Sequence, residues 1–255
     1  MKVSASRRTP SISALAHNLG MSVGENLKRI RERVARAADR AKRDPNSLRL
    51  MAVSKTMPAA HIVEAYDAGQ RLYGENRVQE FADKYDALAR LGNAEFHMIG
   101  HLQSNKANKA TEIFHAVDSL DSVSLGERLN AAAVKLGKSL EVLVEVNVGG
   151  EAAKTGIAPD SAELERILSA APSWPQLQIR GLMTVPPFTD DPEGARPYFR
   201  RLRELCERIA ARKLPAIELD ELSMGMSHDF EIAIEEGSTC VRIGTAIFGE
   251  RSKRG

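Results

Sequence analysis

The 255-residue chain has no apolar run that approaches 18 residues, the length that a membrane-spanning helix requires. It has only two cysteines, Cys206 and Cys240, and neither shows metal-ligand spacing or an obvious histidine partner. We therefore expect no membrane association and no metal site. The two cysteines are interpreted as small buried residues in a protein of the reducing cytoplasm.

An excess of charge of one sign is also missing, because 36 basic residues stand against 34 acidic ones. Six of the basic residues lie in the two tails, three within residues 1–20 and three within the last five residues. Without these six, the body of the chain carries 30 basic and 34 acidic residues. This balance does not favour a basic face on the body, so no nucleic-acid partner is expected.

Residues 1–20 are serine-rich and basic, and they lack the continuous apolar stretch of a secretory signal. We interpret them as a disordered extension or as the product of an upstream start codon ahead of Met21. A transit peptide is a less favoured alternative. Residues 21–255 are expected to form one domain.

From Val23 onward the apolar period switches repeatedly between that of a helix and that of a strand. A helical pattern comes first, and eight units of a strand and a helix follow it. The expected strands cover residues 50–54, 71–74, 95–100, 114–119, 140–148, 177–185, 216–223 and 239–244. Mostly continuous apolar strands with short loops predict an α/β fold, a single (β/α)8 TIM barrel with an additional N-terminal helix. A doubly wound open sheet is the alternative, but no G-x-G-x-x-G follows the first strand.

Functional residues of such a barrel lie where its strands end. The first strand ends in Ser54-Lys55-Thr56, so Lys55 is expected at the barrel mouth, partly desolvated. Burial lowers the pKa of a lysine, and a neutral amine is the nucleophile that reacts with aldehydes. The alternative is a surface lysine at the start of a loop.

Two glycine-containing segments follow the last two strands. Gly244 permits close approach of a ligand, and the N–H groups of a short helix beginning there would point at an anion. The seventh strand runs into residues 222–227, which offer hydroxyl groups and another glycine. Phosphate sites of barrels commonly use these two loops, and barrel closure would put Lys55 beside them. An amine next to a phosphate site suits pyridoxal phosphate. The alternative, for either loop taken alone, is that these glycines are turn residues.

Arg242 interrupts the apolar strand Val241-Arg242-Ile243. A buried arginine keeps its charge and is rare unless it is paired. It could bind the pyridine nitrogen of the cofactor and so disfavour protonation of that nitrogen. The alternative is a structural ion pair with Glu221 or Glu145.

Six segments together resemble the family of pyridoxal phosphate homeostasis proteins, and they span almost the whole body from about residue 24 to 250. They are AVSKT (52–56), YGENRVQE (73–80), FHMIGHLQSNKAN (96–108), VNVGGEAAKTGI (146–157), IRGLMTV (179–185) and ELSMGMSHDFEIAIEEGSTCVRIGTAIFG (221–249).

The resemblance implies a barrel like the N-terminal domain of alanine racemase, with pyridoxal phosphate held as an aldimine on Lys55. It places Ser223, Gly244 and Thr245 at the phosphate and Arg242 at the pyridine nitrogen. It makes Asn76 a polar residue beside the cofactor, while the sequence alone equally favours Asn76 as the N-cap of a helix over 76–91. His97 is left outside the site, and Lys154 and Thr155 are expected in a mobile loop with no assigned role.

The resemblance favours a cytoplasmic cofactor carrier in vitamin B6 and amino-acid homeostasis, without established turnover. Apo-enzymes that receive the cofactor are its expected partners. Only six residues follow Gly249, so the second domain of racemases, with its dimer interface, is expected to be absent and the protein to be a monomer. One alternative is an amino-acid racemase that uses Lys55 and Tyr73, the only tyrosine expected near the mouth. Another is a sugar-phosphate enzyme that uses the phosphate site without the cofactor.

Overall fold

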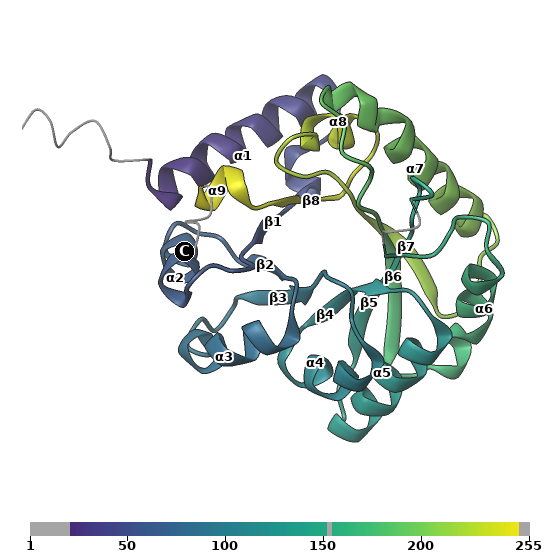
Figure 1. Ribbon diagram of the computed structural model, residues 1–255. Coiled ribbons are helices and arrows are strands. Elements are labelled where there is room, and N and C mark those ends of the chain that lie inside the picture. The colour runs from purple at the N-terminus through teal and green to yellow at the C-terminus, as the bar shows by residue number, and fades with distance from the viewer. Residues whose placement is uncertain (1–20, 152–154, 250–255) are drawn as a thin grey trace, which may run out of the picture.

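The computed structural model describes residues 21–151 and 155–249, and these form a closed barrel of eight parallel strands inside a ring of helices (Figure 1). The strands are β1 Arg49–Val53, β2 Leu72–Glu75, β3 Glu95–Met98, β4 Ala116–Leu120, β5 Leu140–Glu145, β6 Leu177–Met183, β7 Ile217–Ser223 and β8 Cys240–Ile243. The helices are α1 Val23–Arg40, α2 Ala59–Asp67, α3 Val78–Leu88, α4 Ala107–Ile113, α5 Val123–Leu136, α6 Ala162–Ala170, α7 Arg196–Ala210, α8 Phe230–Glu235 and α9 Thr245–Phe248. Short 3-10 helices occupy Pro45–Ser47, Ser104–Lys106, Ala171–Ser173 and Pro192–Ala195.

The predicted barrel is confirmed, with all eight strands in the predicted order and β1 paired with β8. The largest difference in length is in β5, which ends at Glu145 and not at residue 148. Val146 instead forms an isolated bridge with Ile157, so the chain leaves the barrel wall earlier than its apolar pattern indicates. The predicted extension over residues 1–20 lies outside the described residues.

The additional N-terminal helix is also confirmed, and it completes the outer ring beside β8. Ser22 and Glu25 form a capping box that begins α1: Ser22 N–H donates to Glu25 Oε2 at 2.8 Å and Glu25 N–H to Ser22 Oγ at 3.2 Å. The helix after β8 has only four residues, and α1 lies beside it (Figure 1). Asn26 Nδ2 donates to the Ile247 carbonyl at 2.9 Å and so ties α1 to α9.

The apolar core lies between the barrel and its helices. A cluster of four aromatic rings fills this core beside β2 and β3. Tyr73 stacks on Phe96 at 5.1 Å between ring centroids, and Phe81 lies 4.7 Å from both Phe96 and Phe114. Burial of such large rings is a main source of stability. Because successive strand residues face opposite sides, the rings of Tyr73 and Phe96 point outward and their neighbours on β2 and β3 point into the barrel.

Charged groups lie inside the barrel as well. His97 Nδ1 lies 3.0 Å from Asp118 Oδ1, and Arg49 Nη1 lies 2.9 Å from Glu221 Oε2. Burial raises the pKa of Glu221, and the carboxylate of Asp118 raises it further. Asp118 and Glu221 stand on β4 and β7, which are not neighbours, so they approach each other across the interior.

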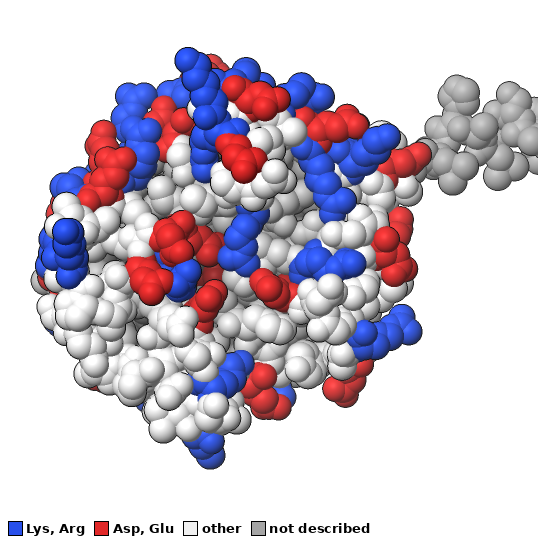
Figure 2. Space-filling model, turned by 180° about the vertical axis from the view of Figure 1, so that it is seen from behind, with Lys and Arg blue, Asp and Glu red and all other residues white. Residues whose placement is uncertain are grey.

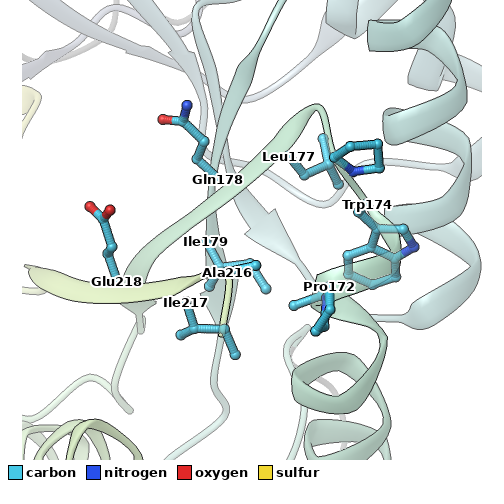
Figure 3. Close-up of a pocket in the computed structure, with 10 residues that line it drawn as sticks. Pro172, Trp174, Leu177, Gln178, Ile179, Ala216, Ile217 and Glu218 are labelled. Carbon is cyan, nitrogen blue, oxygen red and sulfur yellow. The ribbon is translucent and has the colours of Figure 1, made fainter. Parts of the chain in front are cut away.

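Ion pairs lie at the end of the barrel where the strands begin, which is opposite the mouth. Figure 2 shows acidic and basic side chains close together near the centre of this face. Arg180 of β6 lies 2.6 Å from Asp220 Oδ2 and also pairs with Glu218, both on β7. A pocket of about 440 Å³ opens beside them between Trp174 and the first residues of β6 and β7 (Figure 3). Because this pocket lies at the end of the barrel opposite the mouth, it is not the predicted cofactor site.

Within the described part of the chain, no helix combines the length and the apolar character that crossing a membrane would need.

Candidate functional site at the barrel mouth

The six predicted site residues gather at the carboxyl ends of four neighbouring strands. Ser223 is the last residue of β7, Gly244 follows β8, and Arg242 lies within β8, one residue before its end. Lys55 follows β1 by two residues, and Asn76 follows β2 directly. The order of the barrel, β7-β8-β1-β2, therefore brings together residues from opposite ends of the sequence.

The seam between β1 and β8 sets the distance between the lysine loop and the glycine loop. Met51 pairs with Arg242 and Ala52 with Ile243 in parallel register. A Cβ placed on Gly244 would lie 3.4 Å from the carbonyl oxygen of Val53. Lys55 is half-buried two residues beyond Val53, as expected for a lysine at the mouth rather than on the open surface.

Arg242 is 3% exposed and binds two neutral oxygens. Its Nη1 donates to Ser223 Oγ at 2.7 Å and its Nη2 to the Thr184 carbonyl at 2.6 Å. The ion-pair alternative is wrong among the described residues: Glu221 pairs with Arg49, and Glu145 accepts from Thr155. Burial lowers the pKa of Arg242, but a guanidinium begins so high that it stays charged.

Hydroxyl groups and backbone N–H groups meet beside this cation. Ser223 Oγ accepts from Arg242, so its own proton is available for another acceptor. Ser227 Oγ lies 3.5 Å from the N–H of Ala246 in the first turn of α9, next to the exposed Thr245. Asp229, and not Ser227, occupies the N-cap position before α8. Ser227 instead faces α9, where the sequence predicts the phosphate.

Asn76 is half-buried at the end of β2. The helix that follows begins at Val78 with Arg77 at its N-cap position, so Asn76 does not cap it. A Cβ on Gly100 would lie 2.4 Å from the Asn76 carbonyl oxygen, which shows how closely the loop after β3 packs against this residue. The capping alternative is therefore wrong, and Asn76 lies at the mouth.

A buried carboxyl group also lies at this end of the barrel, on a residue that the sequence singles out only as a possible ion-pair partner of Arg242. Glu145 is the last residue of β5 and is 5% exposed, and its Oε1 accepts from Thr155 Oγ1 at 2.6 Å. Its Oε2 is buried without a hydrogen-bond partner in the described structure. Burial raises its pKa. A charged residue that interrupts an apolar strand, the signal that singled out Arg242, would have found it too.

Two other residues stand where their side chains cannot face a ligand at the mouth. His97 is buried against Asp118, as expected for a satisfied strand histidine. The prediction that Tyr73 lies near the mouth is wrong: its ring is fully buried among the outer aromatic residues. Its hydroxyl lies 3.1 Å from the Gln70 carbonyl and 3.3 Å from the Ile62 carbonyl. Lys154 lies outside the described residues.

Comparison with known proteins identifies close relatives over nearly the full chain. Residues 26–252 match the family model described as alanine racemase, N-terminal domain. The pyridoxal phosphate homeostasis protein of Aquifex aeolicus is 46% identical over 231 residues, which cover 91% of this chain and 99% of that protein. The protein of the same name from Escherichia coli K12 is 42% identical and covers 90% of this chain and 97% of its own length.

Solved structures are similar to this chain as well. The structure of PipY from Synechococcus elongatus with PLP bound has a TM-score of 0.77 at 38% identity, covering 89% of this chain and 100% of that chain. An alanine racemase from Clostridium difficile has a TM-score of 0.69 at 12% identity and covers 90% of this chain and 58% of its own. At 12% identity, this likeness shows that the two proteins share a fold and nothing more.

Proposed function

Because the chain belongs to the family of pyridoxal phosphate homeostasis proteins, we propose that it binds pyridoxal 5′-phosphate at the barrel mouth, with Lys55 as the attachment point. The observation that carries the proposal is the meeting of three groups at the seam of β8 and β1. These are the lysine after β1, the buried cation Arg242, and the glycine that precedes α9. Independent support comes from the relative PipY, whose structure was solved with PLP (pyridoxal 5′-phosphate) bound.

The residues present fit the chemistry of this cofactor. When bound, the cofactor supplies an aldehyde that reacts with a neutral amine, and Lys55 is half-buried in the loop where such an amine is needed. Thr245, Gly244 and the hydroxyls of Ser223 and Ser227 would hold the phosphate. Ser227 Oγ and Ala246 N–H are 3.5 Å apart, a long contact that a phosphate oxygen between these donors would replace with charge-assisted bonds.

Arg242 and Asn76 would orient the ring. Arg242 keeps its charge, and a fixed cation beside a ring nitrogen opposes protonation of that nitrogen. A ring held in this way withdraws electrons less strongly than one that faces a carboxylate. Such a ring gives less stabilisation to a carbanion on the bound amino acid.

We further propose that the protein carries the cofactor without catalytic turnover. Racemisation with two bases needs an acid–base group on each face of the substrate carbon. Tyr73, the tyrosine that the racemase alternative requires, is buried outside the barrel with its hydroxyl on backbone carbonyls. The proposal includes a monomeric barrel over residues 21–255 and apo-enzymes as recipients of the cofactor. It also includes a reducing cytoplasm, where the two buried cysteines remain free thiols.

The test is an absorbance titration with pyridoxal 5′-phosphate, followed by borohydride reduction and peptide mapping. We expect a visible band in the wild type, loss of the band in Lys55→Ala, and the reduced label on the peptide that contains Lys55. Lys109→Ala is the control, because Lys109 lies on α4 in a surface pair with Glu112. A label on another lysine, or no label, overturns the proposal. Exchange of the α-proton of any amino acid in D₂O would instead overturn the carrier assignment alone.

A further inference from the structure

Lys55 stands in a turn whose backbone is strained. The N–H of Met57 donates to the carbonyl of Ser54 at 3.0 Å and closes the turn around Lys55 and Thr56. Thr56 has a φ of 64°, in the left-handed region. A β-branched residue rarely adopts this conformation, and it persists only where surrounding contacts hold it.

Three charged residues from β2 and α3 supply those contacts. Lys84 Nζ donates to the carbonyls of Ser54 and Met57, each at 3.2 Å, and so holds both ends of the turn. Glu80, one helical turn before Lys84, accepts from the N–H of Thr56. Glu75, which is fully buried, lies 2.8 Å from Lys84 Nζ. We call Glu75, Glu80 and Lys84 the clamp.

The donors of Lys84 are fully assigned. Its ammonium group has three protons, and two carbonyls and the Glu75 carboxylate accept them. Ser54 Oγ donates to the same Glu75 oxygen at 2.6 Å, which adds a contact to the residue just before Lys55. The Lys84 side chain is only 11% exposed, so this arrangement fixes its position rather than leaving it in solvent.

We propose that Lys84 is a positioning residue for Lys55: with Glu75 and Glu80 it holds the strained turn in the geometry that presents the Lys55 amine to the cofactor. The inference rests on the proposed function, because it gives the clamp a role in cofactor attachment. A surface ion pair would contribute little here. This pair is buried and contacts the backbone on both sides of the one lysine assigned to the cofactor.

The main variant removes both partners of the buried pair, Glu75→Gln with Lys84→Met, so that no unpaired charge is left inside. Glu80→Ala is the second variant, and it removes the acceptor of the Thr56 N–H. Because Glu80 is partly exposed on α3, this change leaves the buried pair intact and the fold in place. Lys109→Met is the matched control, because Lys109 also pairs with a glutamate on a helix but lies away from the turn. All proteins receive pyridoxal 5′-phosphate in excess.

The measurements are the rate constant for formation of the borohydride-reducible adduct, the apparent pKa of its absorbance band, and the melting temperature. We expect adduct formation at least tenfold slower in the double variant, a smaller slowing in Glu80→Ala, and a shifted pKa of the band in both. Lys109→Met should match the wild type. Variants that form the adduct at the wild-type rate with an unchanged band would overturn the inference.

A rescue variant separates positioning from mere stability. Glycine adopts a positive φ without strain, so Thr56→Gly added to the double variant should restore part of the lost rate. If the clamp only stabilises the fold, the added glycine should leave adduct formation slow, even if it restores the melting temperature. If the wild type itself forms no adduct on Lys55, the proposed function fails. If the wild type forms it and the clamp variants do so equally well, only the positioning role fails.

Discussion

Arg242 Nη1 donates to Ser223 Oγ at 2.7 Å across the seam of β8 and β7, and no carboxylate among the described residues forms an ion pair with this guanidinium. A buried cation held only by neutral oxygens is costly, because its lost hydration is not replaced by an opposite charge. Burial accordingly lowers the pKa of Arg242. An arrangement that weakens the fold at the mouth of a barrel is typical of a ligand site.

The first prediction follows from that cost. In Arg242→Gln, the loss of two hydrogen bonds is offset by removal of a buried charge. The free energy of unfolding without cofactor should therefore change by less than about 1 kcal/mol. Affinity for pyridoxal 5′-phosphate should fall at least tenfold, or by about 1.4 kcal/mol. Urea unfolding and absorbance titration measure the two quantities, with the exposed Arg208→Gln on α7 as control. A strong destabilisation with unchanged affinity would make Arg242 a structural residue.

The eight strands were predictable from sequence because barrel strands covered by helices are short, nearly continuous apolar segments. Arg242 and Lys55 were found by the same reasoning, since each places a charge within or just after such a segment. Strand β4, fully buried along its length, shows the limit of the method: Asp118 in it pairs with His97 of the neighbouring strand β3, and this contact depends on how the two strands pair.

Contacts that depend on packing were not predictable. Tyr73 was expected near the mouth because it ends a strand pattern. Successive residues of β2 face opposite sides of the barrel wall. Gly74 faces Met51 and Ile99, so the side chain of Tyr73 points the other way, toward the helices. The clamp joins Glu75 and Lys84, and no periodic signal links two residues nine positions apart across a strand and a helix.

The second prediction concerns Tyr73→Phe. The change removes one buried hydroxyl near two backbone carbonyls and leaves the ring in place. The free energy of unfolding should fall by about 0.5–1.5 kcal/mol, the range for one hydrogen bond. Affinity for pyridoxal 5′-phosphate should stay at the wild-type value, because the hydroxyl lies outside the barrel. Tyr66→Phe on the surface of α2 provides the control. Loss of cofactor binding in Tyr73→Phe would place this tyrosine in the site after all.

The third prediction concerns the pH dependence of stability. Glu236 is 5% exposed and lies 3.0 Å from Arg196 and 3.1 Å from Arg200. Burial raises the pKa of Glu236, but the hydrogen bonds and charges of its arginines outweigh burial and leave this pKa below its usual value. The group therefore contributes stability that is present above its unfolded pKa, about 4.3, and is lost as the pH falls through the lower folded pKa.

Glu236→Gln should lower the free energy of unfolding at pH 7 by about 1–3 kcal/mol. The difference from the wild type should shrink as the pH falls below about 4, where the wild-type carboxylate becomes protonated. Urea unfolding at a series of pH values measures this. Glu165→Gln is the control, since the Glu165 pair with Arg212 is exposed and contributes little. A difference that is constant from pH 7 to pH 3 would show that the charge of Glu236 is not responsible.

The fourth prediction uses a pair of glycines to test the mouth. A Cβ on Gly100 would lie 2.4 Å from the carbonyl oxygen of Asn76, whereas a Cβ on Gly92 would meet nothing within 4 Å. In Gly100→Ala the loop after β3 must move away from Asn76, at a cost of about 1–3 kcal/mol in the free energy of unfolding. Since Asn76 is proposed to contact the cofactor, affinity for pyridoxal 5′-phosphate should fall as well, while Gly92→Ala should leave both quantities unchanged. If Gly100→Ala destabilises the fold but binds the cofactor as tightly as the wild type does, then Asn76 is not among the residues that hold it.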